Sequence, residues 1–146
     1  MYGDFECPYC AAAQSILARV RSRLGDDLRF AFRHLPLEPV HPHARHAAEA
    51  SEAAAAQGAF WEMHDALYAA RGRLGDADLV SHARGLGLDA ERVGRELASG
   101  AYAARVERDA ASAQALGLSS TPAFFVNGIH YGDAYDAGSL VAALRD

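Results

Sequence analysis

Residues 4–10 of the chain are Asp-Phe-Glu-Cys-Pro-Tyr-Cys, a stretch in which two cysteines flank a Pro-Tyr pair. Apolar residues after this stretch recur at helical spacing as far as Gly25, which predicts a helix over residues 11–24. Pro8 suits the first turn of a helix, where its missing N–H has no partner to lose. The sequence therefore predicts that Cys7 and Cys10 lie at the start of this helix.

Two cysteines separated by two residues provide the parts for thiol-disulfide exchange. The reaction needs one thiolate that attacks a foreign disulfide and a second thiol that breaks the mixed disulfide. The free N–H groups and the dipole at a helix start favour the thiolate of Cys7, whereas Cys10, one turn further on, is expected to be shielded. We predict that Cys7 attacks and Cys10 resolves, with Pro8 and Tyr9 tuning the pair.

The same cysteine spacing also occurs in zinc sites, which usually have two such pairs. This chain contains only two cysteines, although His41, His43 and His46 cluster and could complete a Cys2His2 site. We interpret these histidines as a loop followed by a helix start and assign no metal ligand. A non-catalytic zinc-binding or protein-binding domain is the alternative function.

The middle of the chain is predicted to be helical. Residues 28–35 alternate apolar and polar side chains, which predicts a strand with one buried face. From Pro42 to Leu118, glycine breaks divide the pattern into four or five helices, with Asp76 and Asp89 as N-caps. The apolar stripe within residues 60–68 is interpreted as core packing.

The last thirty residues return to strand patterns. Thr121-Pro122 precedes a short apolar run, and Asn127-Gly128 is the strongest short signal for a hairpin. Residues 129–132 would form the return strand and residues 137–144 a closing helix. The order of elements predicts one α/β domain over 1–146 with an all-helical insertion.

Length and charge exclude several functional classes. The chain has 146 residues and a formal net charge of −5, so it lacks the basic excess of a nucleic-acid-binding protein. No stretch is long and apolar enough to cross a membrane, and the N-terminus lacks the pattern of a signal peptide. The chain taken alone is expected to be cytoplasmic.

Two motifs together resemble the DsbA-like branch of the thioredoxin superfamily. They are the stretch 4–10 and the segment Ser-Thr-Pro-Ala-Phe-Phe-Val-Asn-Gly at residues 120–128. Segments 33–37, 41–44 and 58–64 are also similar to that family, so the likeness covers nearly the whole chain.

The resemblance implies a thioredoxin-like core over residues 1–35 and 119–146, an insertion over 41–118, and disulfide exchange with protein substrates. It implies that the Thr121–Pro122 bond is cis, lies beside the cysteines and offers backbone groups to an extended substrate. Thioredoxins and glutaredoxins connect the two motifs with fewer residues. Kappa-class glutathione transferases share the insertion but replace the cysteine pair by a serine.

One departure from the family pattern concerns the first strand, of which this chain has only the end. A sheet without an inner strand leaves backbone groups unpaired and a hole in the core. Our hypothesis is that upstream residues or a partner chain, as in a homodimer, supply the strand. Similar domains also occur fused to sodium/proton antiporters, which would change the expected location.

The direction of electron flow is open from sequence alone. A cytoplasmic location favours a reductase or redox-sensing role over oxidative folding. The expected redox group is the Cys7–Cys10 disulfide itself, with no bound cofactor and with glutathione as a candidate external reductant.

Overall fold

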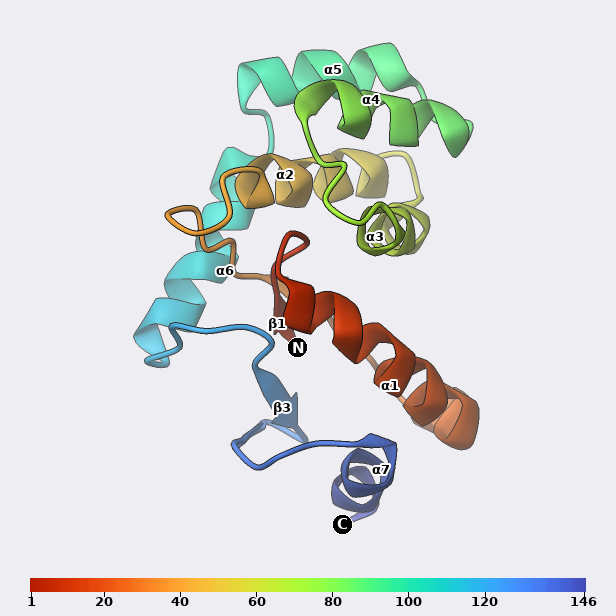
Figure 1. Cartoon of the computed structure of the whole chain (residues 1–146), viewed down its shortest axis with the longest axis vertical. Helices are drawn as coiled ribbons and strands as arrows, with labels where there is room; N and C mark the ends of the chain where they lie inside the picture. The colour runs from red at the N-terminus through yellow and green to blue at the C-terminus, as the bar shows by residue number, and fades with distance from the viewer.

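The computed structural model describes all residues 1–146 (Figure 1). Seven α-helices and four short strands follow one another, with a single 3-10 turn, η1, over Gly25–Asp27. The elements are β1 (Tyr2–Gly3), α1 (Pro8–Leu24), β2 (Arg33–His34), α2 (Ala44–Ala55), α3 (Phe60–Ala69), α4 (Asp76–Gly85), α5 (Ala90–Ser99), α6 (Ala103–Ala115), β3 (Phe124–Val126), β4 (Ile129–Tyr131) and α7 (Ala137–Arg145).

The short strand β1 lies at the centre of the sheet region. It pairs in parallel with β2, with Tyr2 opposite Arg33. On its other side Tyr2 forms an antiparallel bridge with Ala123, just before β3. β1 therefore joins β2 to the hairpin of β3 and β4.

The predicted hairpin at Asn127-Gly128 is confirmed. β3 and β4 pair in antiparallel register, with Val126 opposite Ile129. Asn127 has φ 50° and Gly128 has φ 83°, and positive φ at both central residues is what a two-residue type I′ turn requires. The closing helix is also confirmed as α7, which packs against α1 through Val20, Leu140 and Val141.

Five helices, α2 to α6, lie between β2 and β3, as the helical pattern predicts. Figure 1 shows α2, α3, α4 and α5 grouped on one side of β1 and α1, with α6 leading back to β3. Helix α2 is rich in alanine, and its buried alanines Ala47, Ala50, Ala53 and Ala54 belong to the largest core cluster. Such small side chains let neighbouring helices approach closely.

Two predicted details are wrong. The strand expected over residues 28–35 is regular only at Arg33–His34, because its neighbour β1 is only two residues long. Asp76 is the first residue of α4 and not its N-cap. Gly75 holds that position, and its N–H donates to Asp78. The second predicted cap, Asp89, accepts the N–H of Arg92 as expected.

The stripe predicted as core packing largely is core. Met63, Leu67 and Tyr68 are buried in the main cluster, whereas Trp61 is 39% exposed and lies against Phe30. None of the helices combines the length and apolar character needed to cross a bilayer.

Candidate active site

Cys7 and Cys10 lie at the start of α1, as predicted. Cys7 is the N-cap residue, Pro8 follows at the first helical position, and the carbonyl of Cys7 accepts the N–H of Ala11. Both thiols are free. Proline at this position fixes the backbone where the helix begins, so the two sulfurs are carried on the same first turn.

The two cysteines have different surroundings. Cys10 is completely buried, and burial raises the pKa of its thiol from 9.0 to about 12. Cys10 is therefore a neutral thiol at physiological pH, in line with a shielded resolving residue. Cys7 is also only 3% exposed, which is less than expected for an attacking sulfur. Pro8 and Tyr9 are exposed beside it, Tyr9 by 72%.

The loop before β3 is in contact with Cys7. The Thr121–Pro122 peptide bond is cis. The carbonyl of Thr121 accepts a hydrogen bond from the Cys7 thiol at 3.7 Å between Sγ and O. The hydroxyl of Thr121 is buried without a hydrogen-bond partner. The structure thus brings Thr121 and Pro122 to the cysteine pair from 114 residues away in sequence.

Asp4 is a site residue that the sequence patterns did not single out. Its carboxylate is buried beneath the cysteine turn, where Oδ1 accepts the N–H groups of Glu6 (2.7 Å) and Cys7 (3.2 Å). Its Oδ2 accepts the N–H of Leu37 at 2.9 Å and lies 2.8 Å from Nδ1 of His41. One carboxylate therefore ties the residues before Cys7 to the loop after β2.

A sequence signal for Asp4 did exist. Aspartate commonly accepts the N–H groups two and three residues ahead of it in an Asx turn, and Cys7 follows Asp4 by three. Glu6 adds a second tie, because its Oε2 accepts the N–H of His43 at 2.7 Å. What the sequence did not show is that Leu37 and His41 would bind the other carboxylate oxygen, since those contacts are made only in the folded chain.

Tyr68 of α3 contacts the residues that precede Cys7. Its hydroxyl donates to the carbonyl of Asp4 at 3.3 Å, and burial raises its pKa. The phenol is therefore a neutral hydrogen-bond donor at the base of the cysteine turn.

The histidines considered as zinc ligands are engaged elsewhere. His41 pairs with Asp4, and Nδ1 of His46 lies 2.7 Å from Asp76. His43 is the N-cap residue of α2. No group of three His, Cys, Asp or Glu side chains is arranged to hold a metal ion. The structure gives no support to a Cys2His2 site.

Comparisons with known proteins agree with this geometry. The family model of the DSBA-like thioredoxin domain matches residues 1–144. The chain is similar to a Na⁺/H⁺ antiporter NhaA 1 of Mycolicibacterium vanbaalenii, with 45% identity over 146 residues. That match covers 99% of this chain and 24% of the relative, so the chain spans about a quarter of the length of this antiporter.

Solved structures show the same fold over the full chain. A thioredoxin-like oxidoreductase from Silicibacter pomeroyi is 27% identical, with a TM-score of 0.86 and coverage of 99% of this chain and 82% of that one. BdbD from Bacillus subtilis is 22% identical, with a TM-score of 0.87 and coverage of 99% and 85%. The fold is therefore thioredoxin-like with a helical insertion, and the chain belongs to the family of DSBA-like thioredoxin domains.

Proposed function

We propose that this domain exchanges disulfides with protein substrates through the Cys7–Cys10 pair. The observation that carries the proposal is the placement of the two sulfurs. Cys7 lies at the N-cap of α1 against the Thr121 carbonyl, and Cys10 lies buried one turn further on as a neutral thiol. This asymmetry is what a two-step exchange requires.

In the reductive direction, the Cys7 thiolate attacks one sulfur of a substrate disulfide. A bond forms between Sγ of Cys7 and that sulfur, and the other substrate sulfur leaves as a thiolate. Cys10 then loses its proton and attacks Sγ of Cys7, which forms the Cys7–Cys10 disulfide and releases the second substrate thiolate. The substrate gains two electrons and the cysteine pair loses them. Oxidation of a substrate dithiol is the reverse sequence.

Four further residues have proposed roles. Pro8 and Tyr9 lie between the cysteines and would tune the redox poise, and Tyr9 is exposed enough to touch a substrate. Thr121 and Pro122 would bind an extended substrate segment beside Cys7 through their backbone. The similarity to an oxidoreductase at 27% identity supports this assignment.

The first experiment traps the intermediate. In the Cys10→Ser variant the resolving step is lost, so a mixed disulfide between Cys7 and a substrate peptide containing a disulfide should accumulate. The Cys7→Ser variant should form no adduct, although it keeps one cysteine. Equal adduct formation by the two variants would contradict the assignment of Cys7 as the attacking residue.

The second experiment fixes the direction. The wild-type pair is equilibrated with glutathione buffers, and free thiols are trapped and counted. A potential near about −270 mV would support a reductase served by glutathione or another thiol, whereas a value near about −120 mV would indicate an oxidant. We favour reduction in the cytoplasm. The absence of any reversible disulfide would overturn the proposed function.

We also propose that the domain acts as part of a longer polypeptide that includes a membrane antiporter. The similarity to NhaA-named proteins that are about four times as long supports this context. Immunoblotting of the source cells with an antibody against the domain tests it. A large band in the membrane fraction is expected, and a band near 15.6 kDa in the soluble fraction alone would contradict it.

A further inference from the structure

Two carboxylates directly precede the cysteine turn. Asp4 and Glu6 lie three residues and one residue before Cys7, whereas the first turn of α1 contains no acidic residue. Asp4 is buried, and its carboxylate accepts the N–H of Cys7 at 3.2 Å. A negative charge close to a thiol opposes formation of the thiolate. A site that reacts through the Cys7 thiolate is therefore helped by any group that compensates the charge of Asp4.

The polar partners of the Asp4 carboxylate differ in kind. Three of them are uncharged backbone N–H groups, those of Glu6, Cys7 and Leu37. The fourth is the imidazole of His41, whose Nδ1 lies 2.8 Å from Oδ2. Of the four, only the imidazole can gain or lose a proton. The His41 side chain is 16% exposed and that of Asp4 is 0% exposed, so His41 connects the buried carboxylate to solvent.

The Asp4–His41 pair has two charge states with the same hydrogen bond. With a proton on both ring nitrogens, the imidazolium and the carboxylate together carry no net charge. With a proton on Nδ1 alone, the ring still donates to Oδ2, and the pair carries one negative charge. Histidine is the side chain that ordinarily changes its charge between pH 5 and pH 8. The charge next to the cysteine turn can thus change by one unit without loss of the contact.

The charged groups on the neighbouring segments have other partners. Oε2 of Glu6 accepts the N–H of His43 at 2.7 Å at the start of α2, where the end of a helix favours a carboxylate. Glu38, on the same loop as His41, lies 3.1 Å from Arg45 of α2. The ring of His43 is exposed and makes no hydrogen bond. None of these groups contacts the Asp4 carboxylate.

The groups that the two nearest helices and the loop before β3 bring to the turn are neutral. On α1, burial raises the pKa of Cys10 to about 12. On α3, burial raises the pKa of Tyr68 and lowers the pKa of His64, so neither is charged near pH 7. The loop before β3 contributes the uncharged carbonyl of Thr121. His41 is therefore the group that can alter the charge of the Asp4 carboxylate and its partners.

We propose that His41 is a positioning residue for disulfide exchange, which acts through Asp4: as an imidazolium it compensates the carboxylate and so favours the Cys7 thiolate. The inference rests on the proposed function and adds to it a residue 37 positions after Asp4. As the pH falls, His41 gains its charge, so the Cys7 thiolate persists to lower pH than it would beside a neutral ring. A stabilised thiolate also stabilises the reduced cysteine pair, which makes the pair more oxidising.

The test substitutes His41 in the Cys10→Ser chain, in which Cys7 is the single thiol. In the His41→Asn variant the side-chain amide can donate to Asp4 as Nδ1 does, but it cannot carry a charge. The matched control is His43→Asn, which removes a histidine two residues away whose contact with Glu6 is made by its backbone. Urea unfolding of each variant checks that the fold is retained.

The readout is the rate of alkylation by iodoacetamide between pH 4.5 and pH 9. The Cys7 thiolate attacks the carbon that bears iodine, a sulfur–carbon bond forms and iodide leaves, so the rate follows the thiolate fraction. At pH 5 we expect the His41→Asn variant to react about threefold or more slowly than its parent. At pH 8.5, where a histidine ordinarily has no charge, the two rates should be equal. The His43→Asn control should follow the parent at every pH.

A second readout uses the chain that retains Cys10. At pH 5 the His41→Asn substitution should shift its equilibrium with glutathione towards the Cys7–Cys10 disulfide by about the same factor, because the reduced form loses its stabilisation.

Two outcomes would overturn the proposal. One is the same alkylation profile for His41→Asn and its parent at every pH. The other is a rate reduced by one constant factor at pH 5 and pH 8.5, since this would show that His41 only supports the structure. Alkylation involves no substrate disulfide, so it reports on His41 even if Cys7 forms no mixed disulfide. A failure of this inference is thus separable from a failure of the proposed function.

Discussion

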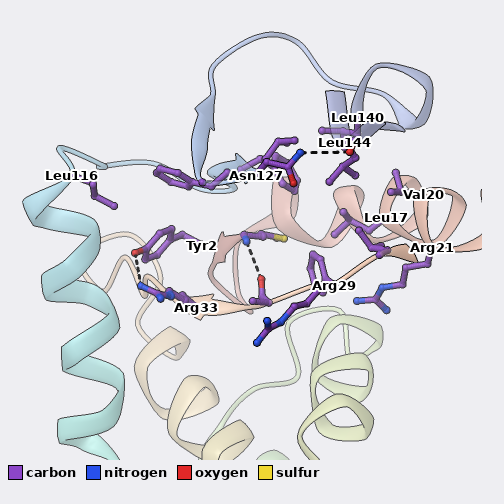
Figure 2. A pocket seen from close by; sticks show the side chains of 18 residues that line it. Tyr2, Leu17, Val20, Arg21, Arg29, Arg33, Leu116, Asn127, Leu140 and Leu144 are labelled. Carbon is purple, nitrogen blue, oxygen red and sulfur yellow. Dashed lines mark hydrogen bonds between the residues drawn. The ribbon is translucent and has the colours of Figure 1, made fainter. Parts of the chain in front are cut away.

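The two ends of β1 differ in how completely their polar groups are satisfied. At the cysteine end, the carbonyl of Gly3 accepts the N–H of Leu35, and the Asp4 carboxylate has four polar partners. At the Met1 end, the amine donates to the carbonyl of Ala31 at 2.9 Å, and a mostly apolar groove of about 600 Å³ opens beside it (Figure 2). The two-residue strand β1 therefore lies between a cysteine turn whose polar groups are paired and an open apolar groove.

The difference shows which contacts hold the candidate site in place. The cysteine turn is held by Asp4, Glu6 and Tyr68, whose partners all lie in this chain. The turn is thus held by contacts at the cysteine end of β1. Four changes test this contrast, and each is measured as a free energy of unfolding.

The largest effect is expected for Asp4→Asn. The amide keeps the shape but replaces one acceptor oxygen by an NH2 group, which then faces N–H donors of Glu6 and Cys7 or of Leu37. We expect a loss of about 2–4 kcal/mol in the free energy of unfolding, measured by urea denaturation. The matched control is Asp89→Asn at an exposed N-cap, where asparagine caps as well as aspartate. Equal losses in the two variants would contradict the role given to Asp4.

Gly3→Ala should cost slightly less. A Cβ at Gly3 would lie 2.6 Å from Cε2 of Phe32, and that ring is enclosed by Phe5, His34 and His64. We expect about 1–3 kcal/mol of destabilisation by thermal or urea unfolding. Gly132→Ala serves as control, because no atom lies within 4 Å of the position that its methyl group would take and its φ is not positive. A neutral Gly3→Ala would show that this end of β1 is loosely packed.

The pH dependence of stability reports on the other end. The folded Met1 amine has a pKa of about 6, below the 8.0 of an unfolded chain. Between these values the unfolded state binds more protons, so the free energy of unfolding should rise from pH 6 to pH 8, by about 1–2 kcal/mol. An extension of Gly-Ser-Gly-Ser-Gly before Met1 moves the amine away and should remove this rise. The same slope in both proteins would mean that another group, such as His64, causes it.

The smallest effect is expected for Tyr68→Phe. This change removes the hydroxyl that donates to the Asp4 carbonyl and keeps the ring in the core. We expect a loss of about 1 kcal/mol in urea unfolding. Tyr131→Phe, whose hydroxyl makes no hydrogen bond in the chain, should change stability by less. A reversal of this order would remove Tyr68 from the set of residues that hold the site.

Sequence patterns predicted the elements whose signals are local. The hairpin at Asn127-Gly128, the helix after Cys7 and the cap at Asp89 each depend on residues within a few positions of one another. The strand expected over residues 28–35 was overextended for the opposite reason. Its alternation of buried and exposed side chains is present. Regular strand geometry also needs backbone hydrogen bonds to a neighbouring strand, and here only the short segment formed by Met1 and β1 provides them.

At the candidate site the sequence placed Cys7 and Cys10 on one helical turn, and the resemblance placed Thr121 and Pro122 beside them. Sequence patterns could not reveal the contacts of Asp4 with Leu37, His41 and Tyr68, because these join residues more than thirty positions apart. Sequence patterns also gave no indication that only 3% of Cys7 would be exposed.

By itself, then, the sequence determined that two thiols lie in the first turn of α1, because their spacing and the proline that begins the helix are local properties of the chain. The tertiary structure decided how that chemistry is held. Burial raises the pKa of Cys10 to about 12, and the carbonyl of Thr121 meets the Cys7 thiol across 114 residues of chain. Both depend on which distant segments exclude water from the sulfurs, and only the folded chain brings those segments together.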